Sequence, residues 1–221
     1  SVRTGANAFA HVHGVDVWTY RSQHPQDGAI FDRAMTGISR AVGEAVATAY
    51  DFGRFACIID VGGGQGAFLA QVLAVHRAPR GVVFDQPHVV AGAPALLEAA
   101  GIADRCTVRE GSFFEAVPEG GDAHVLKGIL HDWEDAAAVA ILRACRTAIR
   151  PDGKVLLIER LIAPPNEAAE AKFSDLNMLV SPGGQERTRE EFAALFAAAG
   201  LRLAAIVATG TALNVIEGVP V

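Results

Sequence analysis

The residues best placed to bind a ligand are the glycines of Asp60-Val61-Gly62-Gly63-Gly64-Gln65-Gly66, between an apolar run at 55–61 and a helical pattern at 67–76. Glycine permits positive φ angles and lets a ligand approach the backbone without meeting a Cβ atom. The free N–H groups at the start of the helix favour a negatively charged ligand group. Two ligands fit, the carboxylate of S-adenosylmethionine and the pyrophosphate of a dinucleotide, because Gly62-x-Gly64-x-x-Ala67 also matches the dinucleotide pattern. A purely structural tight turn is the third reading.

Two further side chains stand at the ends of predicted strands. Asp85 ends the strand at 81–85, and a carboxylate at that place accepts hydrogen bonds from the hydroxyls of a ribose, which both ligands carry. Its alternative role is the N-cap of a helical segment at 88–100. His131, in the segment LHDWED at 130–135, directly follows a strand at 122–128, at the edge of the sheet where ligands bind. A histidine there either takes part in function or merely caps and packs.

The elements that position these residues alternate between strand and helix. The apolar run at 55–61 has no polar alternation, as expected of a strand that is buried on both faces of a parallel sheet. Further strands are predicted at 81–85, 105–110, 122–128 and 154–159, and helices at 67–76, 88–100, 136–149 and 188–199. This alternation predicts a doubly wound α/β domain.

The two ends of the chain depart from this alternation. One face of a long helix at 25–49 is indicated by apolar residues three and four apart, at Phe31, Met35, Ile38, Val42 and Val46. The strand-like runs 201–209 and 211–219 meet at Gly210, a spacing that permits only a hairpin. We therefore predict a mostly parallel seven-stranded sheet that ends in an antiparallel hairpin, with an N-terminal helical extension. Residues 1–52 are expected to be a helical lead-in to the catalytic unit, and 53–221 its ligand-binding catalytic domain.

Composition argues against several classes of function. The 221 residues carry a formal net charge of -6, and 51% of them are hydrophobic and 20% charged, which is typical of a soluble globular protein. Lysine and arginine are scattered, so we expect no nucleic-acid partner, and the apolar runs are too short to span a membrane. Cys57, Cys106 and Cys145 are odd in number and widely spaced, which argues against disulfides and a zinc site and favours a reducing cytoplasm.

Five motifs follow one another along the chain, namely IIDVGGGQG (58–66), FDQPHV (84–89), GSFF (111–114), KGILHDWED (127–135) and GGQERT (183–188). Together they resemble the plant and bacterial small-molecule O-methyltransferase family, which contains caffeate, flavonoid, acetylserotonin and polyketide O-methyltransferases. The resemblance implies a methyltransferase fold with S-adenosylmethionine as methyl donor and S-adenosylhomocysteine as product. It also implies that the acceptor is a hydroxyl of a small aromatic metabolite, phenolic or polyketide-like.

The resemblance implies catalytic roles for three residues. His131 matches the general base that deprotonates the acceptor hydroxyl, and Glu159 and Glu186 match the two acids that orient and polarise it. A carboxylate near His131 would raise the pKa of the imidazole and fix its tautomer. The alternative readings are a solvated strand end for Glu159 and a surface salt bridge with Arg187 or Arg189 for Glu186.

For the methyl donor, the resemblance implies that Gly62 and Gly64 line the methionyl group and that Asp85 binds the ribose. Ser112 and Phe113 match positions on the adenine side. Many relatives carry Asp where this chain has Ser112, whose hydroxyl is shorter and uncharged, so its contact with adenosine is expected to be weaker or mediated by water.

Five more residues are assigned around this core. Lys127 matches a lysine near the adenine, and Trp133 either closes the adenine pocket or packs in the core. Met35 and Met178 match the pair that holds an aromatic acceptor ring between them, a role that suits soft thioethers, although helical methionines are also ordinary core residues. Asp132, beside His131, is placed on the acceptor side.

Other partners follow from the same comparison. No metal is expected, because the pair His11 and His13 is not accompanied by a matching carboxylate cluster. The family's N-terminal helical domain, which dimerises and covers the partner's active site, has no counterpart in this chain, so a homodimer is expected through that domain in the full-length protein. One rival reading is a nicotinamide-dependent oxidoreductase, which leaves the HDW segment, GGQERT and the final hairpin unexplained. The other is a family member that binds S-adenosylmethionine but performs different chemistry.

Overall fold

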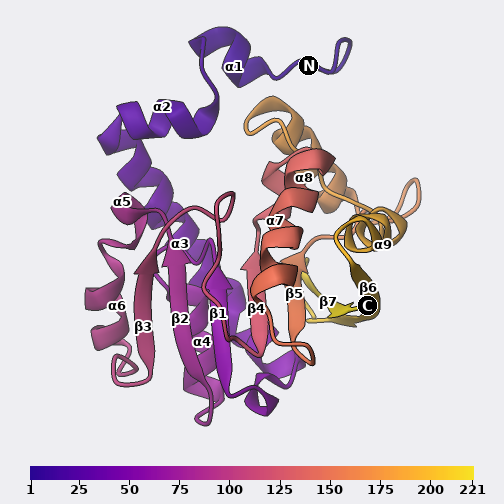
Figure 1. The fold of residues 1–221 in the computed structure, drawn as a ribbon. Helices are drawn as coiled ribbons and strands as arrows, with labels where there is room; N and C mark the ends of the chain where they lie inside the picture. The colour runs from indigo at the N-terminus through magenta and orange to yellow at the C-terminus, as the bar shows by residue number, and fades with distance from the viewer.

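Seven strands form one sheet in the order β3-β2-β1-β4-β5-β7-β6 in the computed structural model, which describes residues 1–221 (Figure 1). They are β1 (Cys57–Val61), β2 (Arg80–Asp85), β3 (Cys106–Glu110), β4 (Ala123–Lys127), β5 (Lys154–Glu159), β6 (Leu201–Ala208) and β7 (Asn214–Pro220). The first five strands are parallel, whereas β7 runs antiparallel to both β5 and β6. The predicted mostly parallel sheet with an antiparallel end is therefore confirmed.

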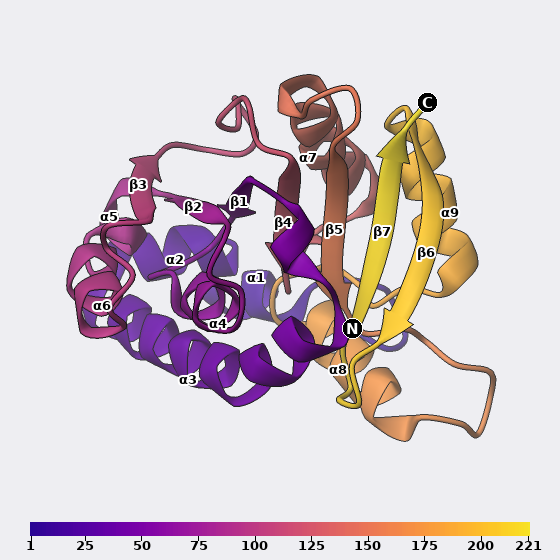
Figure 2. The ribbon, with the colours of Figure 1, turned by 90° about the horizontal axis from the view of Figure 1, so that it is seen from below.

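The helices cover both faces of this sheet, as Figure 2 shows from below. They are α1 (Ala8–His13), α2 (Val17–Gln23), α3 (Pro25–Ala49), α4 (Ala67–Val75), α5 (Pro87–Val90), α6 (Ala93–Ala99), α7 (Asp135–Ala148), α8 (Ala169–Val180) and α9 (Arg189–Ala198), with short 3-10 helices η1 (Phe52–Arg54) and η2 (Leu130–Asp132). Successive strand residues point to opposite faces, so Ile58 packs in the core under α3 and α4 while Ile59 packs in the core under α7 and α9. The central strands are apolar on both faces because helices pack against each face.

Two sequence predictions about element boundaries are wrong. The segment 88–100 is not one helix but two, α5 and α6, because Pro94 lacks an N–H group and its ring would collide with the preceding turn of a continuous helix. Strand β7 begins at Asn214 rather than at 211. Residues 209–213 instead form a turn in which the Thr209 hydroxyl donates a 2.6 Å hydrogen bond to the Leu213 carbonyl.

The long helix α3 occupies the predicted residues, but its apolar face is only partly buried. Val46 is fully buried, and a Cβ atom on Gly43 would lie 2.7 Å from the side chain of Gln71, so this half of α3 packs tightly on α4. Met35 and Ile38, which precede this packed part of the helix, are 37% and 50% exposed. Only the C-terminal half of the helix lies against the sheet layer, because α2 and the chain before it lead away from the sheet (Figure 1).

None of the helices combines the length and the apolar character needed to cross a bilayer. All three cysteines are free thiols; Cys106 and Cys145 are buried and Cys57 is half-buried. Burial raises the pKa of Cys106 and of Cys145 to about 12, so neither is a reactive thiolate at neutral pH.

Candidate active site

The glycine turn connects β1 to α4 at the carboxyl edge of the sheet, where the strand order reverses between β1 and β4. Gly62 and Gly64 have φ angles of 70° and 62°, which favour glycine. A Cβ atom on Gly62 would collide with the Ile129 side chain, whereas one on Gly64 would meet nothing within 4 Å. The backbone at Gly64 therefore faces open space beside the N-terminus of α4, where a ligand can approach it.

Asp85 holds this turn against the end of the neighbouring strand. Its Oδ2 accepts a 2.8 Å hydrogen bond from the Gly64 N–H, and its Oδ1 accepts a 2.7 Å bond from the Gln86 N–H. Gln86, not Asp85, is the N-cap residue of α5, and no side chain caps that helix. Burial raises the pKa of Asp85, although the two backbone hydrogen bonds oppose that rise.

Glu159 positions the short helix η2, which carries His131. The carboxylate is fully buried, and its Oε1 accepts hydrogen bonds from Ile129 N at 3.0 Å and from Leu130 N at 2.9 Å. These N–H groups begin η2 and have no partner within it, so the carboxylate satisfies them as a cap would. Glu159 is thus not a solvated strand end.

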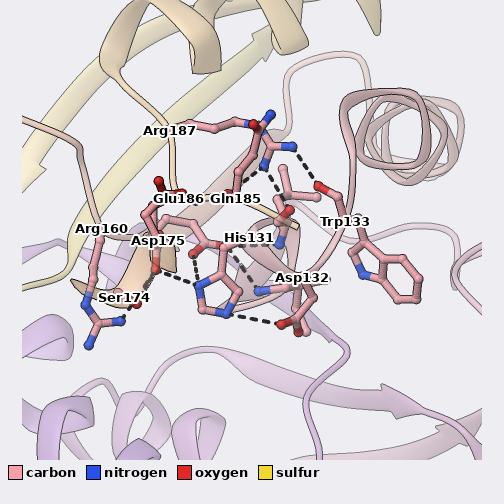
Figure 3. A network of polar contacts seen from close by, with 12 residues as sticks. His131, Asp132, Trp133, Arg160, Ser174, Asp175, Gln185, Glu186 and Arg187 are labelled. Carbon is pink, nitrogen blue, oxygen red and sulfur yellow. Dashed lines mark hydrogen bonds and ion pairs between the residues drawn. The ribbon is translucent and has the colours of Figure 1, made fainter. Parts of the chain in front are cut away.

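The imidazole of His131 lies among three carboxylates (Figure 3). Its Nδ1 is 3.1 Å from Glu186 Oε1 and 3.5 Å from Glu159 Oε2, and its Nε2 is 3.7 Å from Asp132 Oδ1. Burial lowers the pKa of His131, but Glu159, Glu186 and Asp132 outweigh it and raise the pKa to about 9. A proton on Nδ1 is favoured by the two glutamates, which leaves Nε2 as the nitrogen that can exchange a proton with a ligand.

Helix α8 supplies two contacts to Glu186 that the sequence motifs did not predict. The Ser174 hydroxyl donates a 2.6 Å hydrogen bond to Glu186 Oε1, and the Glu186 N–H donates a 2.9 Å bond to Asp175 Oδ1. Met178 lies one turn further along the same helix and is buried. No pattern in the sequence marks Ser174 or Asp175, because their partner lies beyond the end of their own helix.

Arg187 is not the surface partner of Glu186 that the alternative reading required. The arginine is fully buried and donates hydrogen bonds to Leu130 O at 2.9 Å, to Trp133 O at 2.7 Å and to Asp135 Oδ1 at 3.0 and 2.9 Å. It thereby ties the GGQERT segment to both ends of the HDW segment. In the sequence, only the position of Arg187 within the GGQERT motif indicates a functional role.

Gly184 permits a second close approach between the same two segments. A Cβ atom on this residue would overlap the His131 carbonyl oxygen and the backbone between Asp132 and Trp133. Only glycine fits there, because those are backbone atoms that cannot rotate away. The second glycine of the GGQERT motif therefore permits a backbone contact directly behind the histidine.

An aromatic cluster forms the side of the site next to β3. The Trp133 ring is stacked at 5.8 Å from Trp18 and packs edge-on against Phe113 and Phe114, at 6.1 and 4.8 Å between ring centroids. Trp133 is half-buried and also packs against the hydrophobic core under α7. The Ser112 hydroxyl oxygen accepts a 3.3 Å hydrogen bond from Phe114 N at the base of this cluster.

Asp60 of β1 and Lys127, the last residue of β4, lie on neighbouring strands, and the charge of each affects the pKa of the other. Burial lowers the pKa of Lys127, while Asp60 and Glu159 act to raise it. Burial raises the pKa of Asp60 to about 7, and its Oδ2 has no hydrogen-bond partner. This unpartnered buried oxygen stands directly under Gly63, because a Cβ atom there would be 2.8 Å from it.

The remaining predicted residues lie on several different helices. Met178 on α8 is buried, whereas Met35 on α3 is 37% exposed, so the two belong to different elements and different environments. His11 and His13 are exposed on α1. The donor atoms of His131, Glu159 and Glu186 lie within 4.8 Å of one another, a spacing that would also suit a cation; Oε1 of each glutamate accepts a hydrogen bond there, whereas Oε2 of each has no partner.

Comparison with known proteins shows the family of the chain. The model of the O-methyltransferase domain family matches residues 1–202. The chain is 40% identical over 221 residues to the phenazine O-methyltransferase PhzM of Lysobacter antibioticus, covering all of this chain and 65% of that protein. It is 42% identical over 203 residues to the mitomycin biosynthesis 6-O-methyltransferase of Streptomyces lavendulae, covering 92% of this chain and 58% of that protein.

A solved structure extends the comparison to the fold. The O-methyltransferase NcsB1 from neocarzinostatin biosynthesis, in complex with S-adenosylmethionine and 2-hydroxy-5-methyl naphthoic acid, superimposes with a TM-score of 0.92 at 33% identity, over all of this chain and 66% of that one. The chain spans less than two thirds of the length of the two curated relatives named above. On its matched residues, fold and sequence identity, the chain belongs to the O-methyltransferase family.

Proposed function

We propose that the protein transfers a methyl group from S-adenosylmethionine to a hydroxyl of a small aromatic metabolite, with His131 as general base. The proposal depends above all on one observation, the imidazole whose Nδ1 faces Glu159 and Glu186 at the ligand-binding edge of the sheet. Membership of the O-methyltransferase family supports the class of reaction. We further propose that residues 1–52 are part of the catalytic unit and that 53–221 bind the methyl donor.

The glycine turn and the aromatic cluster are suited to the methyl donor. The open backbone at Gly64 and the N–H groups of α4 would hold its carboxylate, and Asp85 the ribose hydroxyls. Ser112, Phe113, Lys127 and Trp133 would surround the adenosine, in the order in which β3 and β4 present them. The sulfonium of the donor supplies an already activated methyl group, so no metal is required for the chemistry we propose.

His131 would take the proton of the acceptor hydroxyl on Nε2. The carboxylates of Glu159 and Glu186 hold the other nitrogen and stabilise the imidazolium that forms. A phenol has a pKa of about 10, so transfer of its proton to the neutral form of an imidazole with a pKa of about 9 costs only about 1.4 kcal/mol. Met35 and Met178 would hold the aromatic ring, and Asp132 would contact it beside the base.

The test compares His131→Ala with His11→Ala, a control on an exposed residue of α1. We expect the first variant to bind S-adenosylhomocysteine with unchanged affinity in a calorimetric titration and to lose methyl transfer to phenols by about 10²–10⁴-fold. The control should keep both properties. Unchanged turnover in His131→Ala would remove the base assignment.

The rival enzymatic reading is separated by the same titration. A nicotinamide-dependent oxidoreductase would bind NAD and not S-adenosylhomocysteine at the glycine turn, and we expect the reverse. A member of the family with other chemistry would bind S-adenosylhomocysteine but transfer no methyl group. The homodimer of the full-length protein remains a prediction, which sedimentation at several protein concentrations would test.

A further inference from the structure

The two glutamates beside His131 each have one bonded and one unbonded carboxylate oxygen. Oε1 of Glu159 accepts hydrogen bonds from the N–H groups at the start of η2, and Oε1 of Glu186 accepts one from the Ser174 hydroxyl. Oε2 of each glutamate is buried and has no hydrogen-bond partner. Both side chains are 0% exposed, and an unpaired charged oxygen away from water is costly. The two free oxygens therefore favour a further, positively charged partner.

The neighbouring cations do not supply that partner. Nδ1 of His131 carries at most one proton, and Glu186 Oε1, at 3.1 Å, is the acceptor of its hydrogen bond. Oε2 of Glu159 lies 3.5 Å from the same nitrogen, which is longer than an ordinary N–H···O hydrogen bond. Nη1 of Arg160 is 4.0 Å from Glu186 Oε1, again too far for a hydrogen bond. Both Oε2 atoms remain without a donor beside two cationic side chains.

The separations within this group match those between ligands of one metal ion. Bonds of about 2.0–2.2 Å in a tetrahedral arrangement place neighbouring ligand atoms about 3.3–3.6 Å apart. Nδ1 of His131 is 3.1 Å from Glu186 Oε1 and 3.5 Å from Glu159 Oε2, and one donor atom from each of the three residues falls within 4.8 Å of the others. Carboxylates that bind metals are usually hydrogen-bonded themselves, as Oε1 of each glutamate is here. Small movements would complete a three-ligand site.

We propose that His131, Glu159 and Glu186 bind a zinc ion that inhibits the enzyme. One imidazole nitrogen and two carboxylates suit Zn²⁺, whereas Mg²⁺ prefers six oxygen ligands in octahedral geometry. The ion takes the lone pair of Nδ1, so the single proton of the neutral ring is on Nε2. Nε2 then has no free lone pair with which to accept the proton of the acceptor hydroxyl. The inhibition depends on the proposed function, whereas the binding of zinc does not.

Arg160 opposes the binding of a cation and also marks its route from solvent. In Figure 3 Arg160, Ser174 and Glu186 lie on one side of the imidazole and Asp132 on the other. The side chains of His131 and Arg160 are 15% and 26% exposed, so the buried glutamates lie one side chain below the surface. A single ion reaches them when either side chain moves. Removing the guanidinium, whose charge repels the ion, should strengthen the binding of zinc.

The test is a calorimetric titration of zinc chloride into the full-length protein after metals have been removed with a chelator. We expect one zinc ion per chain, binding weakened by about 10-fold or more in Glu186→Gln, and binding strengthened by about 3-fold or more in Arg160→Met. The double variant His11→Ala/His13→Ala removes the exposed histidine pair of α1 and should bind zinc as the wild type does. Anomalous diffraction from crystals soaked in zinc should place the ion at Nδ1 of His131.

Methyl transfer provides the second measurement. Saturating zinc should lower the rate by at least about 10-fold, whereas magnesium at the same concentration should not. The absence of saturable binding, unchanged affinity in Glu186→Gln, weaker binding in Arg160→Met or loss of binding in the histidine-pair variant would each overturn the site. Full methyl transfer by the zinc-saturated protein would refute the inhibition. Failure of the proposed function is read separately, as absent methyl transfer by the zinc-free protein, and leaves the calorimetric test of the site intact.

Discussion

Glu186 Oε1 lies 3.1 Å from Nδ1 of His131, in a contact between residues 55 positions apart in the chain. The same oxygen also accepts the hydrogen bond of Ser174, so two donors determine where the carboxylate points. Its other oxygen, Oε2, has no partner. The orientation of the imidazole therefore depends on α8 as well as on the loop that carries Glu186.

Replacing Ser174 by Ala should release Glu186 from α8. We expect the methyl-transfer rate to fall about 3- to 10-fold with the affinity for S-adenosylhomocysteine unchanged, because a hydrogen bond to a charged group contributes about 1.5–3 kcal/mol. The pKa of His131, followed by NMR, should fall because Glu186 is held less firmly toward Nδ1. Ser174→Thr keeps the hydroxyl and should restore both quantities; a Thr variant as impaired as Ala would point to packing instead.

Removing the charge of Glu186 should lower the basicity of His131 directly. Burial raises the pKa of Glu186, but its hydrogen bond and charge interaction with His131 outweigh this and lower it overall. We expect Glu186→Gln to lower the pKa of the imidazole below about 9 and the rate by about 10-fold or more. NMR titration and steady-state kinetics measure the two effects. A pKa of His131 that did not move would show that the interaction is unimportant.

The raised pKa of His131 predicts how stability depends on pH. The imidazole has a pKa of about 9 in the folded protein and about 6.5 in the unfolded chain, so its stabilising contribution is complete below pH 6.5 and is lost as the pH rises through 9. The raised pKa values of Asp60 and Asp132, about 7 each, act in the same direction but at lower pH, between about 4 and 7.

Urea unfolding between pH 6.5 and 9.5 measures this dependence. The free energy of unfolding should decrease across that window in the wild type, and the decrease should be smaller in His131→Gln. Methyl transfer should increase over the same range, since only the neutral imidazole can accept a proton. A positively charged ligand beside the ring would move that increase to lower pH. Identical slopes in both proteins would exclude the proposed pKa.

Gly184→Ala should damage the site through the backbone. The added methyl group would overlap the His131 carbonyl, so we expect a loss of about 1–3 kcal/mol in stability and a large loss of activity. Gly37→Ala is the matched control, because a Cβ atom there meets nothing within 4 Å and alanine favours a helix over glycine by about 1 kcal/mol. Thermal unfolding and activity of both variants test this; an active, stable Gly184→Ala protein would contradict the close contact.

Local patterns in the sequence were sufficient for most of the fold. The apolar runs of β1 and β5, the spacing along α3 and the short hairpin connection each depend on residues close together in the chain, so periodicity reveals them. Pro94 also explains from local sequence why 88–100 forms two helices, because its ring would clash with the preceding turn of a continuous helix. The motifs identified His131, Glu159 and Glu186 as a set, yet could not state how they touch.

Tertiary structure alone decided those contacts. Whether Glu186 meets His131 or Arg187 depends on how the loop after α8 folds back over η2, a contact across 55 residues that no local spacing encodes. The support from Ser174 arises in the same way, since α8 had no motif of its own. Arg160 is an ordinary arginine in the sequence, and only the surrounding structure shows that its buried Nε lacks a partner. Hydrogen bonds between distant segments depend on the relative placement of whole elements, which the packed sheet and its helices determine.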